Sequence, residues 1–235
     1  MSPPGIEEGL ALPEPVRALA ERLGCGSTTG AKSAHVSQVG RMRSNADAKW
    51  MSFRAEQTIG LDACSFSWVA RTGPFGSVRI VDALDRGTGH LQVTALGLLP
   101  LMRSPASPEL DRGELMRYLA EIVWAPEAIL RNRSLYWQVL DNRNLSVSVG
   151  QPDRRATVKF KLDEQGRIAD VTAADRPMIS RSGVRFLPWF GHVADYRHHN
   201  GYWLPFRAEA GWEIDGERII LWEGSITDWR PVPKS

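Results

Sequence analysis

Residues 111–124 of the 235-residue chain contain no proline and have the spacing of a helix, whereas most of the surrounding segments have the spacing of strands. Its apolar side chains recur three or four residues apart, as on one face of a helix; they are Leu115, Leu119, Ile122 and Val123. Asp111 is placed to cap the first turn, with Glu114 three residues later as in a capping box. The helix is expected to end at Ala125, because a residue before proline, here Pro126, is pushed out of the helical region. The pattern therefore predicts one amphipathic helix, which must pack on whatever the rest of the chain forms.

The opposite face of this helix carries charges and aromatic rings. Glu114, Arg117 and Glu121 stack on one side at about 100° per residue, and Tyr118 and Trp124 flank them. Two interpretations stay open at this point. The row is a solvated face with weak ion pairs between residues one turn apart, or it is the wall of a cavity, since a tryptophan is seldom left in water without use. The sequence does not decide which face of the helix is buried.

Most of the remaining chain alternates apolar and polar residues with a period of two, which predicts about ten to twelve antiparallel strands. The clearest alternations span residues 51–57, 78–84, 144–149 and 157–162. Asn200-Gly201 adds a strong two-residue hairpin signal. The pattern predicts an α+β, mostly β fold, in which helix 111–124 packs on an antiparallel sheet.

Four smaller expectations concern the ends of these elements. A short helix is expected over residues 13–23, and another over residues 126–130 after the proline. Residues 100–109 contain three prolines and are expected to form a loop. Residues 218–223 and 225–229 are expected to form two separate strands.

Two strands place a polar side chain on an otherwise apolar face. Gln57 shares a face with Phe53, and Asp82 shares one with Ile80 and Leu84. A buried carboxylate must be paired, hydrogen-bonded or neutral. Asp82 is therefore either a satisfied structural carboxylate or a residue of a functional site.

Composition narrows the possible classes of function. The net charge is +2 and no run of like charges occurs, so the sequence predicts no nucleic-acid partner. No apolar run approaches the ~20 residues of a membrane span, so none is expected. Hydrophobic residues at 43% and charged residues at 24% are ordinary values for a folded domain and argue against disorder.

The N-terminal sequence and the cysteines set expectations about domains and location. Residues 1–12 are expected to form a flexible N-terminus without a signal peptide, since no basic segment and no apolar run begins the chain. Residues 13–235 are expected to form a single domain, because no linker-like composition divides them. Cys25 and Cys64 suggest no disulfide framework, and reduced thiols favour a cytoplasmic location.

Three histidines lie close together in the sequence, at His192, His198 and His199. Adjacent residues of a strand point to opposite faces, so His198 and His199 are poorly placed to share a metal ion. Neither G-x-S-x-G nor H-E-x-x-H occurs in the chain. The sequence therefore predicts no metal site and no cofactor.

One motif resembles a known family. The segment Arg117-Tyr-Leu-Ala-Glu-Ile-Val-Trp-Ala-Pro126 fits the pattern R-Y-L-A-E-x-x-W-x-P and resembles a bacterial family of uncharacterised proteins. Weaker similarities to that family are Val36-Ser-Gln-Val-Gly-Arg-Met42, Phe66-Ser-Trp-Val-Ala70 and Trp203-Leu-Pro205. The resemblance covers most of the chain and implies no activity.

The order of elements also resembles the LolA-like and LppX-like lipoprotein carriers. In those proteins a strongly curved antiparallel sheet, called a half-barrel, is closed by helices over an apolar cavity. The resemblance implies that helix 111–124 and the short N-terminal helix close such a half-barrel here.

These observations lead to three hypotheses of function. The first is a protein that binds a small hydrophobic or amphipathic molecule, a lipid or an organic acid, between helix and sheet. Its expected ligand-binding residues are Phe53, Gln57, Trp68 and Asp82 from the sheet and Arg117, Tyr118, Glu121 and Trp124 from the helix. In this hypothesis Arg117 binds an acidic head group by a two-point contact.

The second hypothesis is an enzyme that uses Glu121 or Asp82 as general acid or base in the same cavity. The third is a protein-interaction module that uses an open sheet edge or exposed tryptophans. The sequence leaves open the identity of the ligand, the oligomeric state and whether any reaction is catalysed.

Overall fold

The computed structural model describes residues 11–26, 30–96, 99–151, 154–180 and 183–233. Its strands form two antiparallel meanders. The first contains β1 (Ala31–Met42), β2 (Met51–Gly60), β3 (Phe66–Thr72), β4 (Val78–Asp85), β5 (Thr88–Ala95) and β6 (Leu99–Arg103). The second contains β7 (Tyr136–Val139), β8 (Asn144–Val149), β9 (Ala156–Leu162), β10 (Ile168–Ser180), β11 (Gly183–His199), β12 (Tyr202–Ile214) and β13 (Glu217–Pro233).

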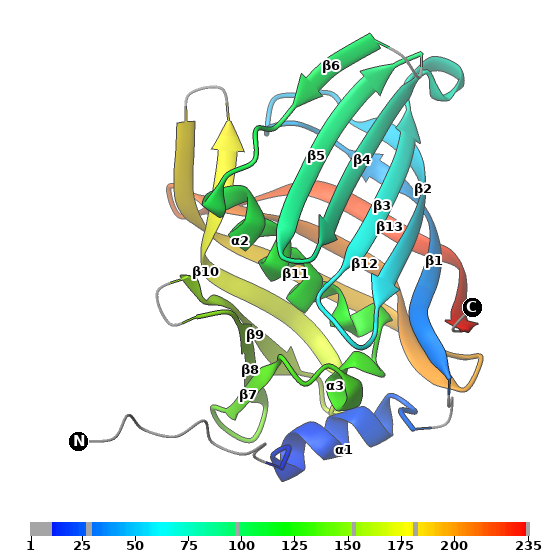
Figure 1. Cartoon of the computed structure of the whole chain (residues 1–235), viewed down its shortest axis with the longest axis vertical. Helices are drawn as coiled ribbons and strands as arrows, with labels where there is room; N and C mark the ends of the chain where they lie inside the picture. Colours follow the sequence, from blue (N-terminus) through cyan, green and yellow to red (C-terminus); the bar gives the residue numbers. More distant parts are fainter. Residues whose placement is uncertain (1–10, 27–29, 97–98, 152–153, 181–182, 234–235) are drawn as a thin grey trace.

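The helices are short and few. They are α1 (Glu14–Arg22), α2 (Pro108–Glu121) and α3 (Ala128–Arg131), with 3-10 turns η1 (Pro74–Gly76) and η2 (Ile122–Trp124). The α2–η2–α3 segment lies between the two meanders in sequence and, in Figure 1, on the inner side of the curved sheet.

All described strands belong to one sheet, in the order β6-β5-β4-β3-β2-β1-β13-β12-β11-β10-β9-β8-β7. The meanders join where β1 pairs with β13, and β6 and β7 are the two open edges. α2 contacts β4 and β5 of one meander and β8, β9 and β10 of the other. The predicted fold class is confirmed: a mostly β, strongly curved antiparallel half-barrel with a central helix and a short N-terminal helix (Figure 1).

Two element boundaries differ from the prediction. The segment expected to be a loop contains the edge strand β6, and α2 begins near its end, at Pro108. Residues 218–229 form one continuous strand, β13, rather than two. Gly224 interrupts the apolar pattern there without breaking the strand, because it pairs with Gly40 of β1 and Ala208 of β12 on either side.

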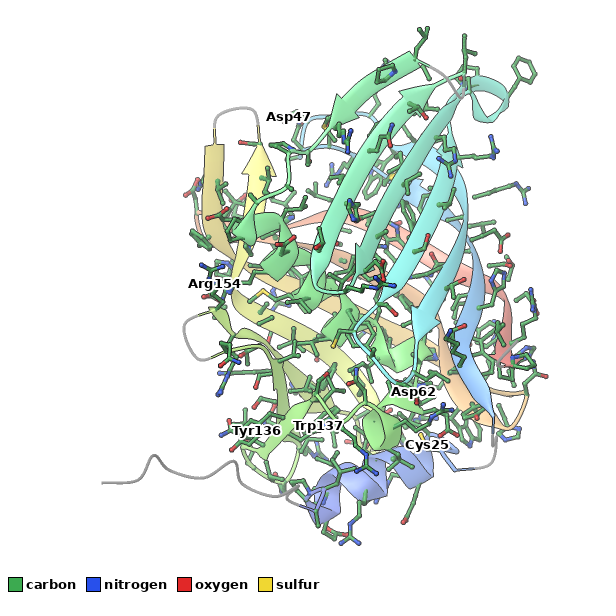
Figure 2. The ribbon with its side chains drawn as sticks, in the orientation of Figure 1. Cys25, Asp47, Asp62, Tyr136, Trp137 and Arg154 are labelled. Atoms are coloured by element: carbon green, nitrogen blue, oxygen red, sulfur yellow. The ribbon has the colours of Figure 1, made fainter. Side chains whose placement is uncertain are left out.

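One end of the half-barrel is closed by α1, which packs against α3 and β7. Val16, Leu19 and Ala20 of α1 are buried there, as expected for the apolar face of an amphipathic helix. Arg131 of α3 makes an ion pair with Asp62 beyond the end of β2, with the atoms 2.8 Å apart. Figure 2 shows Asp62 at this closed end and Asp47 at the opposite end of the molecule.

Candidate functional site

α2 begins at a serine cap. The Ser107 hydroxyl accepts a hydrogen bond from the Leu110 N–H at 3.1 Å, and Pro108 occupies the first turn, where its missing N–H is not required. The prediction that Asp111 caps the helix is wrong, because Ser107 starts it one turn earlier. The Asp111 carboxylate instead accepts from the Gly89 N–H at 2.7 Å and ties α2 to β5.

Both faces of α2 are buried. Leu119 on the apolar stripe is fully enclosed, and Glu114 and Glu121 on the opposite side are only 6% and 9% exposed. The cause is the contact of α2 with both meanders, which leaves neither side of the helix to solvent. The solvated interpretation of the charged row is therefore wrong, and the row faces the interior of the half-barrel.

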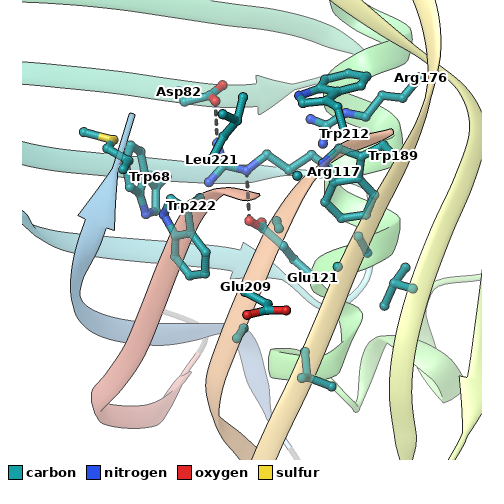
Figure 3. Close-up of a pocket in the computed structure, with 18 of the residues that line it drawn as sticks. Trp68, Asp82, Arg117, Glu121, Arg176, Trp189, Glu209, Trp212, Leu221 and Trp222 are labelled. Atoms are coloured by element: carbon teal, nitrogen blue, oxygen red, sulfur yellow. Dashed lines mark hydrogen bonds and ion pairs between the residues drawn. The ribbon is translucent and has the colours of Figure 1, made fainter. Parts of the chain in front are cut away.

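Arg117 holds two carboxylates in this interior. Its Nε lies 2.9 Å from Oε1 of Glu121, one turn along the helix, and its Nη1 donates to Oδ2 of Asp82 on β4 (Figure 3). Burial disfavours the charged form of Arg117, but the two carboxylates outweigh this effect and raise the pKa of the guanidinium. Arg117 is therefore a fixed cation between two elements.

A chain of buried polar side chains continues from Glu121 into the sheet. Gln57 donates from Nε2 to Oε2 of Glu121 at 2.5 Å, and Gln38 donates from Nε2 to Oε1 of Gln57 at 3.1 Å. Trp68 donates from Nε1 to Oε1 of Gln38 at 2.9 Å. These hydrogen bonds give each side chain a defined orientation, because any other orientation would leave buried polar atoms without partners.

Asp82 and Glu114 form a close pair of carboxyl groups. Oδ1 of Asp82 and Oε2 of Glu114 are buried and have no hydrogen-bond donor among the described residues. Burial raises the pKa of Glu114 well above its ordinary value, and the neighbouring Asp82 raises it further by its charge and by a hydrogen bond between the two groups. Protonation of Glu114 would remove the repulsion between the two buried carboxyl groups.

A cavity of about 450 Å³ lies between α2 and the sheet (Figure 3). Five of the nine tryptophans of the chain line it: Trp68, Trp124, Trp189, Trp212 and Trp222. Its charged lining residues are Arg43, Asp82, Arg117, Glu121, Arg176 and Glu209. The wall is thus mainly apolar, with five indole rings and with charged side chains from both α2 and the sheet.

Two of these tryptophans lie over glycines on the same strand. A Cβ atom on Gly224 would lie 2.3 Å from the Trp222 ring, and one on Gly191 would lie 3.1 Å from the Trp189 ring. Each glycine is two residues after its tryptophan, so the pair shares one face of the strand. The missing side chains let the indoles lie close along the strand rather than project across the cavity.

The structure brings five of the eight expected ligand-binding residues to the cavity wall: Trp68, Asp82, Arg117, Glu121 and Trp124. Gln57 lies behind Glu121, and Phe53 packs behind Trp68 and Trp222 at ring distances of 5.6 and 5.7 Å. Tyr118 lies on another side of α2, where its hydroxyl donates to the Gly60 carbonyl at 3.0 Å. These three residues support the wall or the fold without lining the cavity.

Sequence reasoning missed the part of the wall that the second meander supplies, namely Trp189, Trp212, Trp222 and Arg176. The signal available was the aromatic density of residues 186–190 and the high tryptophan count. Neither signal indicates which strands meet, because that depends on pairing between distant segments.

The three clustered histidines make separate contacts. His192 Nδ1 lies 2.8 Å from Asp170, His199 Nε2 lies 3.0 Å from the Trp229 carbonyl, and the His198 ring packs edge-on against Trp203. In the part of the chain that the structure covers, no three His, Cys, Asp or Glu side chains converge into a metal site. Within the same ranges, no helix has both the length and the apolar character needed to cross a membrane.

Solved structures share this fold at low sequence identity. A putative outer membrane lipoprotein-sorting protein domain from Vibrio parahaemolyticus is 11% identical, with a TM-score of 0.51 over 93% of this chain and 91% of that one. A DUF1329 family protein from Desulfovibrio piger is 11% identical, with a TM-score of 0.50 over 93% and 94%. A LolA superfamily protein from Nitrosomonas europaea is 11% identical, with a TM-score of 0.49 over 94% of both chains.

Sequence comparison gives a family assignment without an activity. No curated protein matches the chain significantly. Residues 6–224 match the family of unknown function DUF6544. The matched residues include the R-Y-L-A-E-x-x-W-x-P segment and nearly all of the half-barrel. The chain therefore belongs to the DUF6544 family.

Proposed function

We propose that this protein binds a small hydrophobic or amphipathic molecule, a lipid or an organic acid, in the cavity between α2 and the sheet. The observation that carries the proposal is the cavity of about 450 Å³ lined by five tryptophans. Ligand pockets in proteins commonly enclose about 300–1,000 Å³ and are mainly apolar with a few placed polar groups. Indole rings supply a large apolar surface that is already ordered by packing.

The shared fold supports the same proposal. The Vibrio domain is described as lipoprotein-sorting, and its half-barrel resembles this one. A fold alone does not specify a function, so the argument rests on the cavity and the fold is additional support.

The two carboxylates considered as general acid or base are held by protein partners in the cavity. Asp82 and Glu121 both line the cavity, and both are hydrogen-bonded to Arg117. Burial raises the pKa of Glu121, and the ion pair with Arg117 acts in the opposite direction. Both oxygens of Glu121 already accept hydrogen bonds, from Arg117 and Gln57, so this carboxyl group is engaged by protein partners rather than directed at a ligand.

Native mass spectrometry of protein purified from a bacterial host, with denaturing extraction of any bound molecule, tests the proposal. We expect a co-purifying lipid or organic acid. Ala210→Trp, which places an indole in the cavity wall, should abolish this added mass, while Lys159→Trp on the exposed side of β9 should retain it. A bare mass for the natural protein, together with no change in tryptophan emission across a panel of ten-carbon amphiphiles, would contradict the proposal.

A further inference from the structure

We propose that Arg176 binds the negatively charged head group, a carboxylate or a phosphate monoester, of the ligand that occupies the tryptophan-lined cavity. This inference rests on the proposed function and names the chemical class of the ligand. It also moves the expected head-group contact from Arg117, whose Nε and Nη1 are occupied, to a second arginine in the same cavity.

The first observation is that Arg176 makes no hydrogen bond or ion pair with another described residue. Its Nε is buried without a hydrogen-bond partner among those residues. Buried charges in proteins are ordinarily paired or hydrogen-bonded, because taking an unpaired charge out of water is costly. An arginine left unpaired beside a cavity is the arrangement expected of a ligand-binding cation.

The second observation is the position of the side chain. Arg176 lies on β10 beside an irregularity in the β10–β11 pairing, and it lines the cavity. Its guanidinium carbon lies 5.0 Å from the centroid of the Trp189 ring and 5.7 Å from that of Trp212. Figure 3 shows the three side chains together at one end of the cavity. The two indoles contact the guanidinium by cation–π interactions, and no hydrogen bond to a described residue occupies its Nη1 or Nη2.

The third observation is the local charge. The carboxyl groups that act on Arg176 belong to Glu114, Asp82 and Glu121. Arg117 makes ion pairs with both Asp82 and Glu121, and its single positive charge offsets only one of their two negative charges. Burial favours the neutral form of Glu114.

The two remaining charged residues of the wall, Arg43 and Glu209, have opposite signs and add no net charge. The six charged residues of the wall therefore balance in sign, but among the described residues none of the carboxylates forms a direct ion pair with Arg176. An anionic head group would supply such a partner.

A planar guanidinium binds carboxylate and phosphate oxygens by two parallel hydrogen bonds, and this geometry selects against alcohols and cations. With the head group at Arg176, an alkyl or aryl tail would lie along Trp222 and Trp124 in the rest of the cavity. The geometry points to a single-tailed anionic amphiphile.

Four probes with the same ten-carbon tail test the head group: decanoate, decyl phosphate, decanol and decyltrimethylammonium. Binding is measured by the change in tryptophan fluorescence. We expect at least one anionic probe to bind about tenfold or more tightly than decanol, the range expected for hydrogen bonds to a charged group. The affinities for decanoate and decyl phosphate then show which of the two anions the site prefers.

Arg176→Met keeps an unbranched apolar side chain and removes the guanidinium and its charge. We expect it to reduce the affinity for the anionic probe to that for decanol while leaving the decanol affinity nearly unchanged. Arg185→Met, at an exposed position on the neighbouring strand β11, should keep the full preference for the anion. Arg176→Gln, which stays polar, provides the same comparison if the methionine variant does not fold.

Two results would overturn the proposal in distinguishable ways. Equal affinity of the natural protein for decanoate, decyl phosphate and decanol would reject the head-group site and leave the binding cavity in place. A retained preference in a folded Arg176 variant would reject Arg176 as its source. Failure of all four probes to bind would count against the proposed function itself.

Discussion

The indole ring of Trp222 lies so close over Gly224 that a Cβ atom on the glycine would come within 2.3 Å of the ring. Phe53 stacks on the same indole at a centroid distance of 5.7 Å. Trp222 therefore has little freedom to retreat, and its position along β13 depends on the missing side chain. The size of the cavity next to it depends on the same glycine.

Gly224→Ala should displace Trp222 and narrow the cavity. We expect the affinity for the preferred ten-carbon probe to fall several-fold, and the free energy of unfolding to fall by about 1–3 kcal/mol, as for other overpacked interiors. Urea unfolding and tryptophan-fluorescence titration measure the two effects. Gly113→Ala is the control, because a Cβ atom in the middle of α2 meets nothing closer than 3.8 Å and should raise stability by about 0.5–1 kcal/mol. Unchanged binding in Gly224→Ala would show that Trp222 does not limit the cavity.

Arg117→Met should be among the most destabilising single changes in the protein. It leaves the carboxylates of Asp82 and Glu121 buried without their cation, and breaking a buried pair in this way costs about 3–5 kcal/mol. The matched control is Arg41→Met. Arg41 also makes two hydrogen bonds to a carboxylate, that of Glu223, but its side chain is 53% exposed, whereas that of Arg117 is 17% exposed. Its loss should destabilise the protein much less than the loss of Arg117, because exposed ion pairs are screened by water. Equal losses in urea unfolding would refute the argument from burial.

Glu114→Gln should change how stability depends on pH. The pKa of Glu114 is raised in the folded protein by burial and by Asp82, so its contribution is complete below the unfolded-state pKa and is lost as pH rises through the folded-state pKa. Glutamine remains neutral at all pH values and can still donate to Asp82. We therefore expect the variant to match the natural protein near pH 4.5 and to be more stable by about 1 kcal/mol or more at pH 8.

Urea unfolding at the two pH values measures this difference directly. Glu164→Gln, at an exposed position in the turn before β10, should show the same difference from the natural protein at both values. If Glu114→Gln behaves like Glu164→Gln, the raised pKa of Glu114 does not contribute to folding.

Tyr118→Phe should lower the stability of the protein without changing its affinity for a ligand. The Tyr118 hydroxyl donates to the Gly60 carbonyl at 3.0 Å and accepts from Nδ2 of Asn132 at 2.9 Å, and the residue is fully buried. Removing the hydroxyl breaks both hydrogen bonds and should cost about 1–3 kcal/mol, with no change in probe affinity. Tyr136→Phe, at a side chain 46% exposed on the edge strand β7, should change neither quantity. Weakened binding with full stability in Tyr118→Phe would place Tyr118 in the binding site.

The sequence predicted those site residues whose positions follow from the spacing along a single helix or strand. Helical spacing placed Glu114, Arg117 and Glu121 in one row, and strand alternation placed Asp82 on an inward face. The structure joins Asp82 and Glu121 through Arg117. Periodicity could not show that both faces of α2 are buried, because burial of the charged face requires sheet on two sides of the helix.

The remaining differences have local or long-range causes. Asp111 is a suitable capping residue by type, but Ser107 and Pro108 already form the first turn of α2 before it. Arg176 and Trp212 reach the cavity only because β10, β11 and β12 curve around α2, which no local pattern encodes. The sequence pattern predicted a break between two strands at Gly224, whereas in the structure this glycine leaves room for the Trp222 ring.

The pairing of β1 with β13 also has a consequence for how the chain folds. Within each meander, neighbouring strands follow one another in sequence and can pair locally, but the seam between the meanders joins the first strand to the last. Such long-range pairing forms slowly, and during synthesis it must wait until β13 has been made. Until then the two half-sheets each carry an unpaired inner edge. The cavity takes Gln38 from β1 and Trp222 from β13, so its wall is complete only when the seam has closed. A molecule bound there would stabilise the closed seam.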